Sequence, residues 1–416
     1  MSTQQTFVIV GASLAGAKAA ETLRTEGFDG RVVLVGAETV RPYERPPLSK
    51  AYLRGEVDFE KAAVHPEGFY EDHGIELITS TMATSINPAV KKVDLDSGGS
   101  LDYDQLLLTT GATPRHIGVP GAELDGVHYL RSLSSCDSLK EALAPAERLV
   151  VVGAGWIGSE VAASARQLGK EVALVESGQV PLERVLGTEV GAIFRDLHAD
   201  RGVELHMGSG VQAFRGSTAA EAVELTDGSV VSGDVFVVGI GVEPSTELAR
   251  VGRLQLDNGI VVDEHLATSA SGIWAAGDVA NAYHPVFGCR IRLEHWSAAL
   301  NQGPVAAKNM LGQGVTYEKI PYFFSDQYDL GMEYNGFAAR WDQIVYRGDR
   351  ASGEVVVFWL DGGVPVAGMN LNVWDVAGPI ADLVGARRPV DPVRLADPDV
   401  DLASLGGPSE SVSKEK

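Results

Sequence analysis

The sequence predicts an α/β protein with two Rossmann-like domains, followed by a C-terminal domain of α+β type. An internal duplication supports the first part. Residues 6–38 and 148–177 each run through a β-branched segment, a glycine turn, an alanine-rich stretch and a second β-branched segment. Parallel strands that are covered on both faces are continuously apolar, so each copy is typical of a βαβ unit. After about residue 320, aromatic residues become frequent and alternating segments such as 355–360 appear, which indicates a third domain of different construction.

Composition narrows the class of protein. The 416-residue chain has 34 Lys and Arg residues against 56 Asp and Glu residues, a net charge of -22. Such an acidic surface repels phosphate backbones, so nucleic-acid binding is not expected. The N-terminus lacks the features of a signal peptide, and the longest apolar stretches, such as 235–242, are too short to cross a bilayer. With only Cys136 and Cys289 there is no disulfide framework, so we expect a cytoplasmic protein without membrane contact.

The first glycine turn lies between the two β-branched segments of the N-terminal copy. Gly11 and Gly16 have the spacing of a dinucleotide-binding turn, but Ser13 replaces the middle glycine and would crowd a diphosphate unless the backbone stands further away. When the copies are aligned, Gly36 takes the place of the acid in the second copy, and the nearest carboxylate is Glu38. Taken alone, this turn also fits a packing role.

Each βαβ copy is followed by alternating segments. Residues 75–111 contain turn signals at 87–88 and 97–99, and residues 203–241 repeat this texture. We therefore expect several short strands in both regions.

The second glycine turn is the stronger nucleotide motif. Gly153 permits the tight turn, Gly155 lets the backbone approach a diphosphate, and Gly158 allows close packing of helix on strand. Glu176 ends the second strand at the distance expected for an acid that accepts hydrogen bonds from the ribose hydroxyls. Because a carboxylate repels a 2′-phosphate, we predict NADH rather than NADPH. The alternative is a glycine turn that only packs.

A third signal indicates a flavin. Residues 268–280 contain an apolar strand that ends at Gly277 and Asp278, before what reads as a helix start. An aspartate there can bond the ribityl chain of a flavin, although it could instead be a structural cap. Together with residues 109–115, which mark the passage from a strand to a linker, this pattern is that of flavoproteins with two dinucleotides.

Several segments together resemble a known family along nearly the whole chain. They are residues 41–50, the turn at Gly153, residues 239–244, Gly277 with Asp278, residues 294–296 and residues 321–328. The chain resembles the FAD-dependent ferredoxin reductases of bacterial cytochrome P450 and dioxygenase systems, the putidaredoxin-reductase type, whose fold is like that of glutathione reductase. The resemblance implies an FAD-binding domain in two pieces (1–113 and 242–320), an NAD-binding domain (114–241), an interface domain (321–403) and a flexible tail (404–416).

The resemblance also implies the reaction. A hydride passes from NADH to non-covalent FAD, and single electrons then pass to a [2Fe-2S] ferredoxin that feeds a cytochrome P450 or another oxygenase; the protein is a monomer or weak homodimer. Lys50 is expected near the reactive face of the flavin, with Glu160 as its partner or as a ligand of the nicotinamide carboxamide. A solvated Lys50 is the alternative. Phe324 stands where the family usually carries a tryptophan near the flavin.

The residues implied in cofactor binding form two sets. Those for FAD are Gly11, Ser13, Leu14, Ala15, Gly16, Glu38, Arg45, Lys50, Met82, Thr110, Gly111, Arg131, Gly277, Asp278, Glu294, His295, Trp296 and Phe324. Those for NAD are Gly153, Gly155, Trp156, Ile157, Gly158, Glu160, Glu176 and Gly241. Trp296 could equally be a core residue.

Missing residues exclude some relatives. Disulfide reductases and NADH peroxidases of this fold need cysteine after the first βαβ unit, and residues 39–60 contain none. The histidines show no metal-ligand spacing, so no metal site is expected. Reductases of rubredoxin or quinone, and NADH-sensing flavoproteins like apoptosis-inducing factor, remain as alternatives. An acidic ferredoxin would need a basic docking face, for which the candidates are Arg290, Arg292, Arg387, Arg388 and Arg394. These arginines could instead be scattered and solvated.

Overall fold

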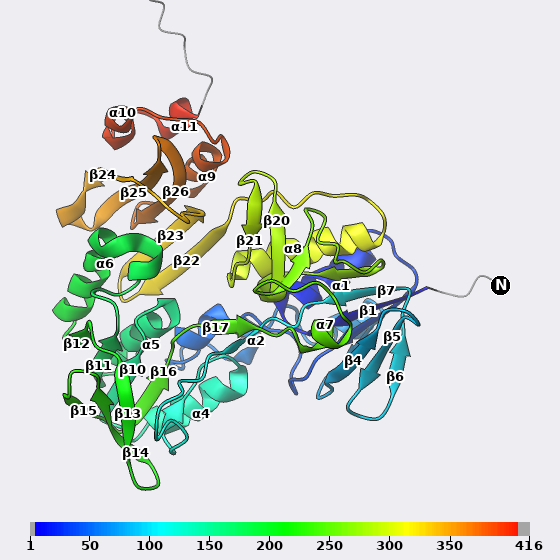
Figure 1. The fold of residues 1–416 in the computed structure, drawn as a ribbon, viewed down its shortest axis with the longest axis horizontal. Helices are drawn as coiled ribbons and strands as arrows, with labels where there is room; N and C mark the ends of the chain where they lie inside the picture. The colour runs from blue at the N-terminus through cyan, green and yellow to red at the C-terminus, as the bar shows by residue number, and fades with distance from the viewer. Residues whose placement is uncertain (1–4, 407–416) are drawn as a thin grey trace, which may run out of the picture. The chain divides into compact units, whose positions relative to one another are not determined.

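A computed structural model describes residues 5–406, the side chain of residue 351 excepted (Figure 1). The chain divides into two compact units, unit 1 (Met1–Tyr317) and unit 2 (Glu318–Lys416). Unit 1 contains two parallel five-stranded sheets, and unit 2 contains an antiparallel five-stranded sheet. The predicted fold class, two Rossmann-like parts and a C-terminal part of another type, is confirmed. The predicted boundaries of the FAD- and NAD-binding domains remain a proposal.

The first parallel sheet is built on the N-terminal βαβ unit. Its strands in spatial order are β19 (Ile273–Ala275), β7 (Gln105–Leu108), β1 (Thr6–Val10), β2 (Arg31–Val35) and β3 (Ile75–Ile78). Helices α1 (Leu14–Thr25) and α8 (Trp296–Met310) pack so closely that a side chain at Gly303 would collide with the carbonyl oxygen of Ala15. Since β19 and α8 lie far along the chain, the later part of unit 1 completes the sheet that the first part begins.

The second parallel sheet repeats this plan. Its strands are β12 (Glu204–Met207), β11 (Glu171–Glu176), β10 (Arg148–Val152), β16 (Val235–Val238) and β9 (Val127–His128). Its helices are α4 (Leu133–Leu143), α5 (Trp156–Gln167) and α6 (Glu183–Asp200). Val10 pairs with Val35 in the first sheet, and Val152 pairs with Val175 in the second. Gly36 therefore corresponds to Glu176, as the aligned sequences predict.

Short strands form the expected smaller sheets of unit 1. They are β4 (Ala83–Asn87), β5 (Lys92–Leu95) and β6 (Ser100–Asp102); β13 (Val211–Gly216), β14 (Ala220–Leu225) and β15 (Val230–Ser232); and β18 (Ile260–Val262), β20 (Ala280–His284) and β21 (Cys289–Ile291). Where the chain passes between the two parallel sheets, β8 (Ala112–Pro114) pairs with β17 (Val242–Pro244). The short helices are η1 (Pro46–Ser49), α2 (Phe59–Ala62), α3 (Phe69–Asp72), α7 (Glu247–Val251) and η2 (Gly277–Val279).

Unit 2 is an antiparallel sheet with helices beside it. The strand order is β22 (Tyr322–Gln327), β23 (Leu330–Gly336), β26 (Val364–Leu371), β25 (Glu354–Asp361) and β24 (Gln343–Asp349), with η3 (Arg350–Ser352) between β24 and β25. Helix α9 (Ala377–Gly385) packs so closely on β26 that a side chain at Gly368 would come within 2.5 Å of Ile380. Helices α10 (Pro392–Ala396) and α11 (Leu402–Leu405) follow. Trp359 is fully buried in β25.

Two local expectations are wrong. After Gly277 and Asp278 the chain makes one 3-10 turn, η2, and then continues as strand β20, because the segment Ala280–His284 pairs with β18 and β21. The predicted tail begins too early, since Asp401 caps α11 and this helix includes Ser404; residues 407–416 lie outside the described part. In residues 5–406, no helix is both long and apolar enough to cross a membrane.

Candidate functional site: two nucleotide turns and the contacts between them

The first glycine turn joins β1 to α1. Gly11 has φ +118°, and side chains at Gly11 and Gly16 would collide with the backbone of Thr109 and with the carbonyl oxygen of Gly11. Packing therefore requires both glycines. Ser13 is the N-cap of α1 with an extended backbone, but its side chain makes no capping hydrogen bond, and the first turn contains no acid. The amide groups at this helix end can therefore serve an external anion such as a diphosphate.

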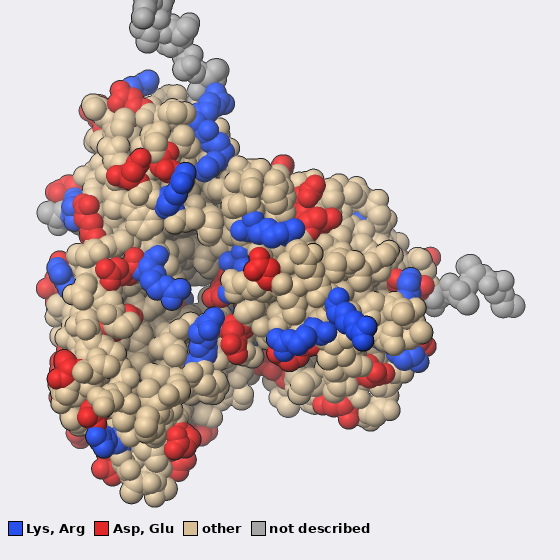
Figure 2. Space-filling view, viewed as in Figure 1, with Lys and Arg blue, Asp and Glu red and all other residues tan. Residues whose placement is uncertain are grey.

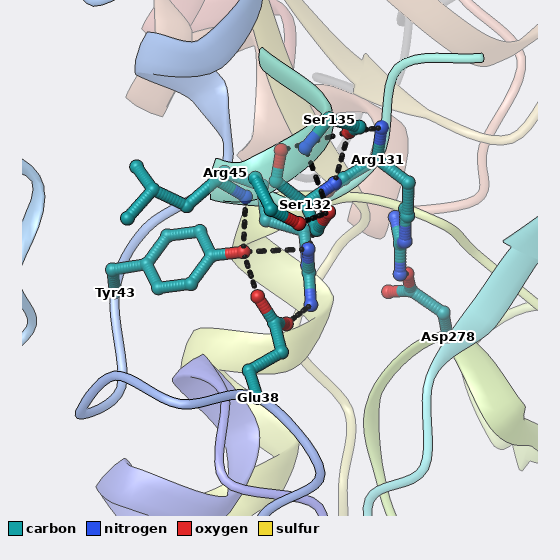
Figure 3. Close-up of polar contacts among 9 residues, drawn as sticks. Glu38, Tyr43, Arg45, Arg131, Ser132, Ser135 and Asp278 are labelled. Atoms are coloured by element: carbon teal, nitrogen blue, oxygen red, sulfur yellow. Dashed lines mark hydrogen bonds and ion pairs between the residues drawn. The ribbon is translucent and has the colours of Figure 1, made fainter. Parts of the chain in front are cut away.

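A fixed carboxylate lies beyond β2 at the same edge of the sheet. Tyr43 donates its hydroxyl to Glu38 Oε2 at 2.6 Å, and Arg45 Nη2 donates to Glu38 Oε1 at 2.9 Å (Figure 3). The Tyr43 hydroxyl accepts a hydrogen bond from the amide of Leu133, at the start of α4, at 2.9 Å. Burial raises the pKa of Tyr43, so this hydroxyl keeps its proton and remains a donor. Glu38 retains lone pairs with which to accept hydrogen bonds from ribose.

A second charged contact lies beside the first. Arg131 Nη2 is 2.8 Å from Asp278 Oδ2, and Arg45 donates to the carbonyl oxygen of Arg131. A side chain at Gly111, which has φ +71°, would lie 3.3 Å from the Arg131 guanidinium. The fold therefore brings together Arg45, Arg131 and Asp278, which are distant in sequence (Figure 3), and places Gly111 beside Arg131. Two guanidinium groups beside a carboxylate suit a diphosphate joined to a ribityl chain.

The turn η2 lies against the start of α1. A side chain at Gly277 would come within 3.3 Å of Ala15 Cβ. The amide of Gly277 donates to Gln302 Oε1 of α8 at 2.8 Å. The start of α1, the turn η2 and helix α8 thus meet around Ala15. Together with the amides at the start of α1, the two arginines and Asp278, this arrangement fits FAD.

The ion pair of Lys50 and Glu160 links the two glycine-turn regions. Lys50 Nζ is 2.7 Å from Glu160 Oε2, and the side chains are 12% and 4% exposed. The buried hydroxyl of Ser49 donates to the same Oε2 at 2.5 Å. Ser164 Oγ donates to the carbonyl oxygen of Ser49 at 2.7 Å, which holds the end of η1 against α5. The structure thus pairs the two residues that the family resemblance implies near the flavin, and Lys50 is not a solvated surface lysine.

The second glycine turn joins β10 to α5. Side chains at Gly153 and Gly158 would collide with backbone, whereas the space where a side chain of Gly155 would begin is open to 4 Å. Gly155 is the N-cap of α5 and is exposed. Glu176 Oε2 accepts from the amide of Ala154 at 2.7 Å, and Oε1 accepts from the amide of Gly178 at 2.9 Å. This edge has room for the backbone-to-diphosphate approach that NAD binding needs.

Other predicted contacts lie around these two turns or apart from them. Around the first turn, Leu14 opens α1, Thr110 Oγ1 donates to the carbonyl oxygen of Ser245 at 2.7 Å, and Glu294, His295 and Trp296 lead into α8. Around the second, Trp156 and the exposed Ile157 begin α5, and Gly241 has φ +101°.

Two predicted FAD contacts lie apart from the turns. Met82 is 56% exposed and lies two residues beyond Ser80, whose amide donates a hydrogen bond to the carbonyl oxygen of Glu38. Phe324 lies on β22 in unit 2, and its contact with a flavin stays a prediction.

Comparison with known proteins gives the family. Residues 5–303 match the family described as pyridine nucleotide-disulphide oxidoreductase, and residues 322–406 match the family described as reductase C-terminal. The chain belongs to the pyridine nucleotide-disulphide oxidoreductases. This family implies FAD and NAD(P)H, for which the residues at the two turns provide fitting donors and open backbone.

Three relatives place the chain more closely. It is 38% identical to rhodocoxin reductase of Rhodococcus erythropolis, covering 95% of this chain and 93% of that protein. It is 39% identical to the ferredoxin--NAD(+) reductase component of the anthranilate 1,2-dioxygenase system of Burkholderia cepacia, covering 96% and 98%. The crystal structure of a covalent putidaredoxin reductase–putidaredoxin complex matches with TM-score 0.93 at 36% identity, covering 96% and 98%. The predicted family and the ferredoxin reductase activity are confirmed.

The five arginines expected at a docking face differ in their surroundings. Arg387 and Arg388, which follow α9, and Arg394 of α10 are exposed, and Figure 2 shows Lys and Arg side chains gathered on this part of unit 2. Arg290 lies on β21 and is exposed, although Nη1 donates to the carbonyl oxygen of Val262. Arg292 is only 9% exposed and pairs with Glu294, so its charge is not presented to a partner. The prediction for Arg292 is therefore wrong.

Four residues that the sequence did not single out hold this site together. Tyr43 and Ser49 lie inside the segment 41–50, whose value as a motif could have indicated them. Thr109 Oγ1 donates to the carbonyl oxygen of Gly11 at 2.8 Å, and Gln302 accepts from Gly277. Nothing in the sequence indicates Gln302, because its role depends on how α8 packs against η2.

Proposed function

We propose that this reductase takes a hydride from NADH onto FAD and passes single electrons to a [2Fe-2S] ferredoxin that serves a cytochrome P450 or another oxygenase. The single observation that carries the proposal is the contact of Lys50 with Glu160, because it links the region after one glycine turn to the helix that starts at the other. A reaction between two bound dinucleotides needs such a junction.

The protein's contribution is to bind and orient the two dinucleotides. A bound flavin supplies the change from two-electron to one-electron transfer. The backbone at Gly11 and Ser13, with Arg45, Arg131 and Asp278, would hold FAD. The ammonium group of Lys50 would stabilise negative charge that develops beside it, and Glu160 would fix the position of that ammonium group. Because Glu160 is only 4% exposed, the pair is largely screened from water.

The choice of NADH rests on Glu176. Its carboxylate is held by the amides of Ala154 and Gly178 at the end of β11. In that position it can accept hydrogen bonds from ribose hydroxyls and repel a 2′-phosphate. We expect Glu176→Gln to reduce the preference for NADH, measured as the ratio of kcat/KM with NADH to that with NADPH.

The partner is inferred from relatives and from charge. One relative is named as part of a dioxygenase system, and another is seen in a covalent complex with putidaredoxin. Arg387, Arg388 and Arg394 would meet an acidic ferredoxin in spite of the net charge of -22. Reversing the charge at Arg387 and Arg388 should raise the KM for ferredoxin and leave the NADH–ferricyanide rate unchanged. An unchanged ferredoxin KM would remove these residues from docking.

Stopped-flow reduction tests the function directly. The purified protein is mixed anaerobically with NADH or NADPH, the bleaching of the flavin is followed, and the reduced protein is then mixed with a panel of iron–sulfur proteins. Rapid bleaching by NADH and rapid reduction of a [2Fe-2S] protein are expected. Slow reoxidation by every acceptor would favour an NADH sensor, and protein that binds no flavin would end the proposal.

A further inference from the structure

A second carboxylate lies beside Glu176, on the next element of the chain. Glu183 is the first residue of α6, and both of its carboxylate oxygens accept hydrogen bonds. The amide of Gln179 donates to Oε2 at 2.7 Å, and Thr188 Oγ1 donates to Oε1 at 2.9 Å. The side chain is partly buried and held from two sides, so its charge has a fixed place.

Glu183 and Glu176 meet at Gly178. The point where a Gly178 side chain would begin is 2.7 Å from Glu183 Oε2 and 3.6 Å from Glu176 Oε1. Because Gly178 carries no side chain, both carboxylates can reach the space that a side chain there would occupy. Their hydrogen-bond donors are uncharged, namely backbone amides and the hydroxyls of Ser177 and Thr188. These bonds fix both negative charges without neutralising them.

We propose that Glu183 is a second residue that determines nucleotide specificity, by excluding a 2′-phosphate through charge rather than by bonding the ribose. The inference rests on the proposed function, since it takes the edge after β11 as the place of the adenosine ribose. A 2′-phosphate carries up to two negative charges and would enter the field of both carboxylates. Glu176, already engaged with Ala154 and Gly178, is the group that bonds ribose, and Glu183 adds repulsion alone.

The size of the effect follows from Coulomb repulsion and its screening by salt. Charges separated by about one Debye length, roughly 8 Å at physiological salt, still interact measurably at a protein surface. Removing one such charge should change the binding ratio of ligands with and without a 2′-phosphate about two- to fivefold. The change should grow at low ionic strength and shrink at high salt, which a merely structural role for Glu183 would not produce.

The test uses ligands that report only on the ribose end. ADP-ribose and 2′-phospho-ADP-ribose are titrated into the flavin-loaded wild type, into Glu183→Gln and into Glu183→Asp, at low and high salt. The matched control is Glu171→Gln, which removes the same charge from the opposite end of β11, where Glu171 is 71% exposed. Glu183→Gln should raise the relative affinity for 2′-phospho-ADP-ribose two- to fivefold at low salt. Glu183→Asp, which keeps the charge, and Glu171→Gln should retain the wild-type ratio.

Three results would overturn the inference: an unchanged ratio in Glu183→Gln at low salt, an equal gain in Glu171→Gln, or a gain that does not depend on salt. Failure of the proposed function looks different. If the wild type binds the two ligands equally well, the NADH preference itself is absent. If the wild type discriminates and Glu183→Gln discriminates as strongly, only the role of Glu183 is refuted.

Discussion

Alanine substitutions at two glycines of the second turn separate binding from packing. A side chain at Gly158 would collide with the carbonyl oxygen of Gly153 and would lie 3.1 Å from its carbonyl carbon and 3.3 Å from Val151 Cγ1. At Gly155, three residues earlier, no atom beyond its own two chain neighbours lies within 4 Å of the added carbon. If the turn exists to let a diphosphate approach, Gly155→Ala should impair NADH binding and spare the fold, while Gly158→Ala should damage the fold.

The expected magnitudes differ accordingly. Gly155 is an N-cap, where alanine is less favourable than glycine by up to about 1 kcal/mol, and nothing else opposes the new methyl group. Gly158 is inside the helix, where alanine would normally gain about 0.5–1 kcal/mol, but the backbone collision reverses this. Overpacking costs about 1–3 kcal/mol, and a clash with backbone rather than with a flexible side chain belongs at or above the upper end.

The assays are thermal unfolding, flavin content and the KM for NADH with ferricyanide as acceptor. Gly155→Ala should keep the wild-type flavin content and nearly the wild-type Tm, with a KM for NADH raised about tenfold, as expected when about 1.4 kcal/mol of binding is lost. Gly158→Ala should lower the Tm or the yield of folded protein. A wild-type KM in Gly155→Ala would refute the binding role of this turn, and a wild-type Tm in Gly158→Ala would refute the packing argument.

Further outcomes follow from single contacts. Ser49→Ala removes a buried hydrogen bond to a carboxylate, so it should lower the unfolding free energy by about 1.5–3 kcal/mol and slow the reduction of the flavin by NADH. Ser49→Thr is the conservative control, and equal flavin reduction rates in wild type and Ser49→Ala would exclude a positioning role. Burial lowers the pKa of His295 to about 4, so wild-type stability, compared with His295→Gln, should fall as pH drops from about 6.5 towards 4, and parallel pH profiles would contradict this. Burial raises the pKa of Cys136 to about 12, so a thiol reagent should label only the exposed Cys289 in native protein, and two labels per chain would contradict it.

Local patterns were enough for much of the fold. The two βαβ units could be predicted because a buried parallel strand is a continuous apolar segment and the turn after it is rich in glycine, and both patterns lie within about 30 residues. The correspondence of Gly36 with Glu176 followed from aligning the two copies, and the strand registers agree with it. The helix expected after Asp278 was wrong because small residues fit both a helix and a strand, and pairing of β20 with two distant strands decides between them.

Site residues divide in the same way. The family resemblance indicated Lys50 and offered Glu160 as its partner, but Ser49 as the donor to Glu160 emerged only from the packing of η1 beside α5. It also suggested five docking arginines alike, whereas burial and an ion pair remove Arg292. The sequence shows that an arginine is charged, but whether this charge can contact a partner protein depends on which residues fold against the side chain.

The sequence alone therefore determined the kind of chemistry. It contains two dinucleotide-binding turns and the acids that follow them, and residues 39–60 contain no cysteine that could react. What only the tertiary structure decided is which side chains meet, such as Tyr43 with Leu133 and Glu183 with Gly178. The physical reason is range. Turn geometry and strand burial depend on neighbours in sequence, whereas hydrogen bonds and fields act over a few ångströms of space between segments whose separation along the chain carries no signal.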